Sequence, residues 1–297
     1  MKTIYLLYIL LAIFTLGCSS DDTEGMTVSE NGPTVALEAT TMLDISYGDH
    51  PDQAYDLYLP KNRTSKKTKV VLLVHGGGWI EGDKASMQVF IDYLQNQHPD
   101  YAIANINYRL AQPPLVPAFP HQFLDVGRVI DVLREQSEEL QIKPEFGIIG
   151  TSAGAHLAMQ YDYVYDVKDE VKMVCNIVGP SNLTDPFYTE DSRFALVLPF
   201  MVDRQQYPAG TDLAAAVSPA LQVTAASSPT IMFYGTTDPL VPVSNAEVLR
   251  DNLDAFNIPN QLTVYEGGHG NWAAKDEVDL QQKVTSFLNL YLEVATD

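Results

Sequence analysis

The amino-acid sequence predicts an α/β fold with a mostly parallel central sheet and helices on both of its faces. Three observations support this prediction. Apolar runs of strand length alternate along the chain with segments of helical spacing, which is the order of elements in a doubly wound sheet. The run at 70–74 is apolar at every position, as is typical of a strand covered on both faces. Glycine-rich turns directly follow two of the expected strands.

Composition and charge limit the classes of function. Hydrophobic residues make up 46% of the 297-residue chain and charged residues 19%, a globular composition that excludes a disordered or fibrous protein. The chain has 18 lysines and arginines against 38 aspartates and glutamates, so its formal net charge is −20. This charge would repel a nucleic-acid backbone or an anionic membrane surface. We therefore expect no nucleic-acid partner.

The expected strands and helices follow one another in a regular order. Two alternating segments form a hairpin at a sheet edge, and the later strands are apolar runs. Strands are expected at 43–47, 55–59, 70–74, 101–106, 146–149, 171–178, 230–234 and 261–265. Helices are expected at 86–97, 120–139, 153–163, 244–256 and 277–294. Together they are expected to form one domain over residues 41–297.

The segment 180–218 interrupts this alternation. It is rich in proline and aromatic residues. We predict an insertion that packs as a small lid over the C-terminal edge of the sheet. Ligands of open α/β sheets bind at that edge, so the insertion is expected to cover part of the site.

The first forty residues are expected to lie outside the folded domain. Residues 4–16 are almost unbroken apolar sequence, too short for a membrane span of roughly 20 residues and typical of a secretory signal. The sequence around Cys18 resembles a bacterial lipobox, although Thr15 stands where most lipoboxes have an aliphatic residue. The resemblance implies a lipoprotein signal peptide over 1–17 and a diacylated Cys18. The polar segment 18–40 is then expected to form a flexible acidic tether.

This N-terminal segment also predicts where the protein resides. A lipid on Cys18 would anchor it to the outer membrane or cell surface of a Gram-negative bacterium, and the serines and aspartates after Cys18 resemble surface-export tags. An ordinary signal peptide with an incidental cysteine predicts a periplasmic or secreted protein instead. Membrane contact is expected only through the anchor. Cys175 then has no disulfide partner, and its apolar surroundings in sequence predict a buried structural thiol.

The sequence Gly150-Thr151-Ser152-Ala153-Gly154 predicts a catalytic nucleophile. It follows an expected strand and precedes an expected helix, and G-x-S-x-G in that position forms a nucleophile elbow. The chain turns so sharply there that side chains at positions 150 and 154 would clash. We therefore predict Ser152 as the nucleophile, exposed at the tip of the turn.

A second glycine-rich segment, H-G-G-G-W at 75–79, follows the fully apolar strand. Glycines leave backbone N–H groups open to a substrate oxygen. We predict an oxyanion hole formed by the N–H groups of Gly77, Gly78 and Ala153. A turn without a catalytic role and a phosphate-binding loop are the alternatives, but the lysine and serine or threonine typical of a phosphate loop are absent here. His75 is expected to fix the loop.

The general base and its orienting acid are expected in the loops after the last two strands. Of the six histidines, only His156 and His269 follow Ser152. His156 lies one turn along the elbow helix and faces away from its tip, so it is expected to be structural. His269 lies in the loop after the last strand, and Asp238 is the one acid in the loop after the preceding strand. The order Ser152, Asp238, His269 predicts a catalytic triad.

These motifs resemble the α/β-hydrolase superfamily and, within it, the H-G-G-G-W esterases. That group includes bacterial feruloyl and acetyl-xylan esterases and carboxylesterases similar to hormone-sensitive lipase. The resemblance covers about residues 42–295 and extends to segments at 107–110, 119–125 and 154–158. Thr151 and Ala155 depart from it, since relatives often have glycine or another small residue there.

The resemblance implies a serine carboxylic ester hydrolase that needs no cofactor and no metal; zinc-binding patterns are absent from the sequence. Expected substrates are plant polysaccharides or their oligosaccharides that carry acetyl or feruloyl groups, or another small ester. An amidase similar to kynurenine formamidase and a catalytically silent hydrolase fold that binds a ligand are the alternatives. Trp79, Phe187, Tyr188 and Trp272 are candidates to line the substrate pocket, and packing in the core is the alternative for each.

Overall fold

The structure, a computed structural model, describes residues 37–294. The expected signal peptide, Cys18 and most of the expected tether lie outside the described residues. Within residues 37–294, no helix is both long and apolar enough to cross a membrane.

The folded domain begins earlier than the sequence predicts. Residues 37–40 are expected in the tether, but the structure joins them to the domain. Leu37 O accepts a hydrogen bond from Asn62 N (2.8 Å), and Glu38 O accepts one from the Arg63 guanidinium (2.6 Å). The polar composition of this segment predicts a tether. Contacts with a loop that is distant in the sequence have no local sequence signal, so they could not correct that prediction.

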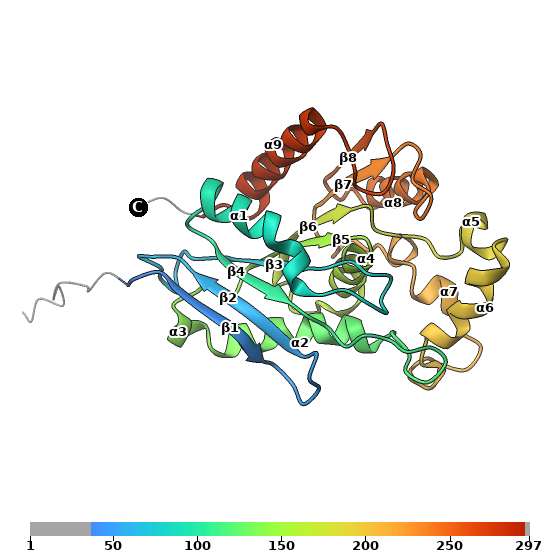
Figure 1. The fold of residues 1–297 in the computed structure, drawn as a ribbon, viewed down its shortest axis with the longest axis horizontal. Helices are drawn as coiled ribbons and strands as arrows, with labels where there is room; N and C mark the ends of the chain where they lie inside the picture. Colours follow the sequence, from blue (N-terminus) through green and yellow to red (C-terminus); the bar gives the residue numbers. More distant parts are fainter. Residues whose placement is uncertain (1–36, 295–297) are drawn as a thin grey trace, which may run out of the picture. The chain divides into compact units, whose positions relative to one another are not determined.

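The domain is built on an eight-stranded sheet in the order β1-β2-β4-β3-β5-β6-β7-β8 (Figure 1). The strands are β1 (Thr40–Ser46), β2 (Ala54–Leu59), β3 (Val70–Val74), β4 (Ala102–Ile106), β5 (Phe146–Thr151), β6 (Val171–Ile177), β7 (Thr230–Gly235) and β8 (Asn260–Tyr265). β2 is antiparallel to both of its neighbours, and the remaining pairs are parallel. This arrangement confirms the predicted fold class.

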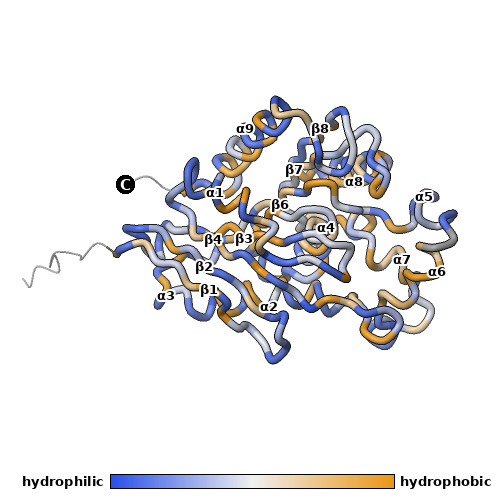
Figure 2. Tube along the Cα trace, in the orientation of Figure 1, coloured by the Kyte–Doolittle hydropathy of each residue, from blue (hydrophilic) through white to orange (hydrophobic). Residues whose placement is uncertain are grey.

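Alternate side chains of the central strands build an apolar cluster on each face of the sheet. The helices are α1 (Gln88–Gln97), α2 (His121–Glu135), α3 (Ser137–Leu140), α4 (Ala153–Gln160), α5 (Pro186–Thr189), α6 (Ser192–Met201), α7 (Leu213–Ala216), α8 (Val243–Ala255) and α9 (Ala274–Tyr291). Leu72 and Val74 pack with α2, α4 and α8, whereas Val71 and Leu73 pack with α1 and α9 on the other face. Figure 2 shows hydrophobic residues along the inner strands, between these two layers of helices.

Three expected helices differ locally from the prediction. The segment 120–139 forms α2 and α3, which are separated at Gln136. The segment 86–97 begins with a 3₁₀ turn at Lys84–Met87, and α4 continues as a π turn at Tyr161–Tyr165. Hydrophobic spacing does not distinguish such turns from an α-helix over four or five residues.

The insertion predicted at 180–218 lies between β6 and β7 and contains α5, α6 and α7. Figure 1 shows these helices grouped at one end of the sheet. The middle of the insertion is tied to the loop before α2, because Phe119 N donates to Met201 O (2.9 Å) and Asp203 N donates to Phe119 O (2.8 Å).

Candidate active site

Ser152 lies in the sharp turn between β5 and α4. Its backbone has φ 51° and ψ −120°, a conformation that is strained for a residue with a Cβ atom. A Cβ at Gly150 would lie 2.5 Å from Ala155 N, and one at Gly154 would lie 2.2 Å from Val74 O. Both positions therefore require glycine. Ser152 N donates to the end of β6 (2.8 Å), which fixes the turn against the sheet.

The structure brings the three side chains of the predicted triad together. His269 Nδ1 lies 2.6 Å from Asp238 Oδ2, and His269 Nε2 lies 2.9 Å from Ser152 Oγ. A carboxylate can only accept a hydrogen bond, so Nδ1 carries the imidazole proton. Nε2 then accepts from the Ser152 hydroxyl. The geometry is that of a nucleophile, a base and an orienting acid.

Two neighbouring loops hold the acid and the base in place. The first follows β7 and carries Asp238, and the second follows β8 and carries His269. A Cβ at Gly235 would lie 2.2 Å from Gly268 O, so glycine lets the two loops meet. The next two N–H groups of the first loop donate to carbonyls at the end of β8 and in the second loop (both 2.9 Å). Backbone hydrogen bonds thus set the separation of acid and base.

The carboxylate of Asp238 is buried, and hydrogen bonds from neighbouring groups stabilise its charge. Its side chain has 0% exposure, and Oδ1 accepts from Leu240 N (2.8 Å) and Val241 N (3.0 Å). Burial disfavours the charged form, but the hydrogen bonds from His269 and from these two N–H groups outweigh it. The pKa of Asp238 is therefore held below its usual value. An ionised Asp238 can stabilise a protonated imidazole.

The glycine-rich loop after β3 lies against the nucleophile. A Cβ at Gly76 would lie 3.2 Å from Ser152 Cβ. Gly77 and Gly78 have φ values of 122° and 56°, which favour glycine. A Cβ at Gly77 would lie 1.9 Å from Glu81 O, whereas a Cβ at Gly78 would meet no atom within 4 Å. Gly77 therefore allows the turn to close, and Gly78 faces open space.

The N–H groups predicted to form an oxyanion hole are free to bind a substrate oxygen. Within residues 37–294, neither Gly77 N nor Gly78 N donates a hydrogen bond. Ala153 is the first residue of α4, where N–H groups have no partner inside the helix. The partial positive charge at a helix N-terminus adds to their attraction for an anion. The arrangement fits the stabilisation of negative charge on a carbonyl oxygen attacked by Ser152.

Two side chains that the sequence assigns to structural roles are buried. His75 stacks on Tyr108 with 4.3 Å between ring centroids, and the Tyr108 hydroxyl donates to His75 O (3.0 Å). Burial lowers the pKa of His75. His75 thus anchors the start of the glycine-rich loop.

Cys175 is fully buried in β6, as predicted, and burial raises the pKa of its thiol.

The four aromatic candidates for the substrate pocket lie in different environments. Trp272 is buried in the apolar cluster on the α9 side and packs on Tyr265 (4.9 Å between centroids). Tyr188 is also buried, and its hydroxyl donates to a backbone carbonyl (3.2 Å). Both rings therefore pack in the interior, Trp272 from the loop after β8 and Tyr188 from the short helix α5. Phe187 is 43% exposed, and Trp79 is half-buried.

His156 is fully buried, as a structural role predicts, but it has two partners that sequence reasoning missed. Trp79 Nε1 donates to Nδ1 (3.2 Å), and Nε2 donates to Val217 O (2.8 Å). Burial lowers the pKa of His156 to about 4, so the ring is neutral at neutral pH. These partners lie 77 and 61 residues away along the chain, too far for any local pattern to reveal them.

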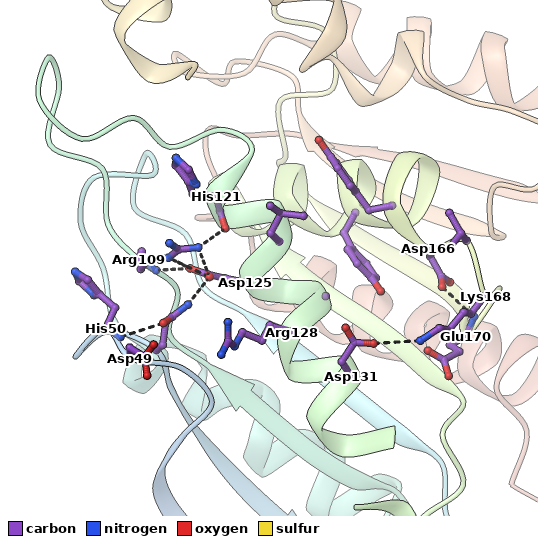
Figure 3. Close-up of a pocket in the computed structure, with 16 residues that line it drawn as sticks. Asp49, His50, Arg109, His121, Asp125, Arg128, Asp131, Asp166, Lys168 and Glu170 are labelled. Atoms are coloured by element: carbon purple, nitrogen blue, oxygen red, sulfur yellow. Dashed lines mark hydrogen bonds and ion pairs between the residues drawn. The ribbon is translucent and has the colours of Figure 1, made fainter. Parts of the chain in front are cut away.

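A groove of about 840 Å³ lies along α2, and none of the predicted catalytic residues line it (Figure 3). At one end, Asp125 accepts hydrogen bonds from Arg109 Nη2 (2.7 Å) and Gln53 Nε2 (2.7 Å). Further along, Lys168 lies 3.4 Å from Asp131. Most charges of the groove are satisfied within the chain. The ion pair of Arg109 and Asp125 stabilises the start of α2, because Arg109 Nη2 also donates to His121 O (3.1 Å).

The strand order, the elbow after β5 and the acid and base loops after β7 and β8 define the α/β-hydrolase class. The chain belongs to the BD-FAE family, whose family model matches residues 55–253. That match includes the glycine-rich loop, Ser152 and Asp238, and it ends before His269.

Individual proteins and solved structures are also similar to this chain. The chain is 27% identical over 250 residues to a probable isoprenylcysteine alpha-carbonyl methylesterase of Arabidopsis thaliana, a match that covers 75% of this chain and 49% of the relative. It thus spans about half the length of that curated relative. Among solved structures it is similar to a truncated carbohydrate esterase from gut microbiota (TM-score 0.66, 19% identity, 86% of this chain and 99% of that chain). It is also similar to an acetyl ester-xyloside bifunctional hydrolase from Caldicellulosiruptor lactoaceticus (TM-score 0.66, 18% identity, 88% and 100%).

Proposed function

We propose that this protein is a serine carboxylic ester hydrolase. The observation that carries the proposal is the relay from Ser152 through His269 to Asp238, with distances of 2.9 and 2.6 Å, beside the N–H groups of Gly77 and Gly78, which have no acceptor among residues 37–294. Membership of the BD-FAE family and the esterase names of its relatives support it. We disfavour a silent fold, because such a protein typically lacks the serine, the histidine or a glycine of the glycine-rich loop, and this chain has all of them.

The proposed reaction has two halves. Ser152 Oγ attacks the ester carbonyl while His269 Nε2 takes its proton, and the ionised Asp238 stabilises the imidazolium. The N–H groups of the glycine-rich loop and of Ala153 bind the oxyanion. The imidazolium then protonates the departing alcohol, which leaves an acyl group on Ser152. A water molecule, deprotonated by His269, releases the acid and restores the serine.

We propose an acylated carbohydrate as the substrate, with acetyl as the first choice of acyl group and feruloyl as the second. Two of the similar solved structures are named as a carbohydrate esterase and an acetyl ester-xyloside hydrolase. An uncharged acetylated sugar is not repelled by a chain with a net charge of −20. A polymer outside the cell is also the substrate that a surface lipoprotein would meet.

The test is hydrolysis by the domain that begins at residue 37. We expect release of acetate from p-nitrophenyl acetate and from acetylated xylan, and loss of both activities in Ser152→Ala. Faster hydrolysis of p-nitrophenyl ferulate than of p-nitrophenyl acetate would reverse the order of the two acyl groups. A folded domain that hydrolyses none of these esters would overturn the proposed function.

We also propose that Cys18 carries a lipid that anchors the protein to the outer membrane or cell surface. The lipobox-like sequence at Cys18 and the short apolar segment 4–16 support this. In cells fed radiolabelled palmitate, the full chain is expected to incorporate label and Cys18→Ala is not. Equal labelling of the two chains would contradict the anchor.

A further inference from the structure

Trp79, at the end of the glycine-rich loop, has an unusual backbone conformation. Its φ is 68°, a left-handed value that is strained for an aromatic residue. Such a conformation persists only where the surrounding structure holds it. Trp79 O accepts hydrogen bonds from Gln122 Nε2 (2.8 Å) and Ala111 N (2.9 Å). The backbone of Trp79 is therefore fixed from the side of α2.

The indole of Trp79 is fixed from a second side, by α4. Its Nε1–H donates to His156 Nδ1 (3.2 Å), and the two rings meet edge to face with 5.3 Å between centroids. The same helix begins directly after Ser152, and His156 N donates to Ser152 O (3.1 Å). His156 thus connects the turn that presents the nucleophile to the loop that faces it.

The other side of His156 reaches the insertion. Its Nε2–H donates to Val217 O (2.8 Å), at the end of α7. The ring is fully buried, and Phe119 and Phe123 lie beside it at 5.1 and 5.5 Å between centroids. A neutral imidazole can donate at one nitrogen and accept at the other. Here both are used, so the ring can adopt only one tautomer and one orientation.

We propose that His156 is a positioning residue, which holds the N–H groups of Gly77 and Gly78 in place for the oxyanion through its bond to Trp79. The bond to Val217 ties the same ring to the insertion. The Gly78 N–H lies in the same peptide plane as the Gly77 carbonyl, whose oxygen accepts hydrogen bonds from Ile80 N (3.2 Å) and Glu81 N (3.0 Å). The turn that starts at Gly77 therefore sets the direction of this N–H, and Trp79, inside that turn, fixes where the turn lies. This inference rests on the proposed ester hydrolysis.

Two substitutions of His156 each remove one of its two side-chain hydrogen bonds and keep the other. In His156→Asn the amide oxygen takes the place of Nδ1, so the acceptor for Trp79 is kept and the bond to Val217 is lost. In His156→Gln the amide nitrogen takes the place of Nε2, so the bond to Val217 is kept and the acceptor is lost. Trp79→Phe removes the indole donor from the other side. Tyr101→Phe is the matched control, because it removes a buried hydrogen bond to Leu292 O (2.8 Å) on the opposite face of the sheet.

We expect His156→Gln and Trp79→Phe to lower kcat for p-nitrophenyl acetate by about 10- to 100-fold, because small displacements of an oxyanion donor are costly. KM should change little, and His156→Asn should recover most of the loss. Trp79→Phe combined with His156→Gln should be no worse than either alone. Tyr101→Phe should leave kcat unchanged. Equal losses in the asparagine and glutamine variants, or additive losses in the double variant, would overturn the proposal.

A spectroscopic readout separates failure of this inference from failure of the proposed function. The chain has two tryptophans, Trp79 and Trp272, so its spectrum contains two indole N–H resonances. The Trp79 resonance and the Gly77 and Gly78 amides should shift in His156→Gln and stay near their original positions in His156→Asn. Wild-type protein without esterase activity would overturn the proposed function, and with it the role of His156 in that reaction. Active protein in which these resonances do not move would overturn only the positioning role.

Discussion

The catalytic loops and the insertion between β6 and β7 are held in place by different means. The loops that carry Ser152, Asp238 and His269 are fixed by hydrogen bonds between adjacent backbones and by glycines at points of closest approach. The insertion consists of short helices, and on α6 the side chains of Leu196 and Phe200 are 70% and 52% exposed. We infer that the sheet sets the geometry of the reaction and that the insertion contributes to recognition of the substrate.

The largest effect is expected at the nucleophile. Ser152→Ala should lower kcat by about 10⁴-fold or more, because no other group can form the acyl intermediate. Steady-state hydrolysis of p-nitrophenyl acetate measures this, with the thermal unfolding midpoint as a check that the variant is folded. Retention of a tenth of the activity would mean that another residue attacks the ester.

A buried carboxylate in each region gives the next comparison. Asp238→Asn should lower kcat by roughly 10³- to 10⁴-fold, because the amide favours the wrong tautomer of His269. Asp185, in the insertion, is also buried and accepts from the Ser244 hydroxyl (2.6 Å). Asp185→Asn should cost less than about tenfold in kcat. Similar losses in the two variants would show that the insertion takes part in setting the catalytic geometry.

Two neighbouring glycines test the oxyanion loop. Gly77→Ala places a Cβ against Glu81 O and should displace the loop, with a loss of about 10²- to 10³-fold in kcat. Gly78 also has a left-handed backbone, but the Cβ of Gly78→Ala would enter open space. The loss in kcat should therefore be about tenfold or less. Kinetics of both variants on p-nitrophenyl acetate measure the difference. A smaller loss at Gly77 than at Gly78 would place the constraint elsewhere in the loop.

The imidazole of His156, which links the catalytic loops to the insertion, should make the free energy of unfolding depend on pH. The pKa of His156 is lowered to about 4 by burial, from 6.5. Above pH 6.5 the ring is neutral in both the folded and the unfolded chain. Between pH 6.5 and 4 only the unfolded chain takes up the proton, so the free energy of unfolding should fall by about 3 kcal/mol, and by no more below pH 4.

Denaturant unfolding of wild type and His156→Gln at pH 7 and pH 4.5 measures this effect. The stability of the wild type should approach that of the variant as the pH falls, because the variant has no such proton. Asp162, whose pKa is raised to about 7 by burial, acts in the opposite direction but is common to both chains, so it cancels in the difference. A difference in stability that is the same at both pH values would contradict the buried neutral imidazole.

The smallest effect is expected on the exposed face of α6. Phe200→Ser should leave kcat for p-nitrophenyl acetate within about twofold and the unfolding free energy within about 0.5 kcal/mol, because the side chain is half exposed. The ratio of kcat/KM for p-nitrophenyl octanoate to that for the acetate should fall by about threefold, because an insertion that takes part in substrate recognition would lose apolar area for a long acyl chain. An unchanged ratio would argue that this face of α6 takes no part in substrate recognition.

Much of the fold could be predicted from the sequence because its signals are local. The strand at 70–74 is found at the expected residues, since a run of five valines and leucines has the length of a strand covered on both faces and is too short for a typical buried helix. Ser152, Asp238 and His269 each lie just after the carboxyl end of a strand, β5, β7 and β8 respectively. Because these strands are parallel, their carboxyl ends meet at one edge of the sheet. The elbow was recognisable because Gly150 and Gly154 reflect a steric requirement that the structure shows directly.

The remaining features depend on contacts between distant segments. Whether an aromatic ring such as Trp272 points toward a substrate or into the core is decided by how its loop packs, and sequence spacing carries no information on that. The helix predicted at 120–139 is interrupted at Gln136 without a change in the apolar spacing, so the sequence pattern does not indicate the interruption. The bonds of His156 to Trp79 and Val217 join three parts of the chain that only the folded sheet brings together.

The most direct test of the proposed relay is to find which residue reacts with a fluorophosphonate. Such a reagent loses fluoride to a serine only where a base activates the hydroxyl and donors stabilise the negative charge on the phosphoryl oxygen in the transition state. Peptide mass spectrometry of the labelled domain should show one adduct, on Ser152, and none in His269→Ala. Labelling of another residue, or equal labelling of wild type and His269→Ala, would contradict the relay of Ser152, His269 and Asp238.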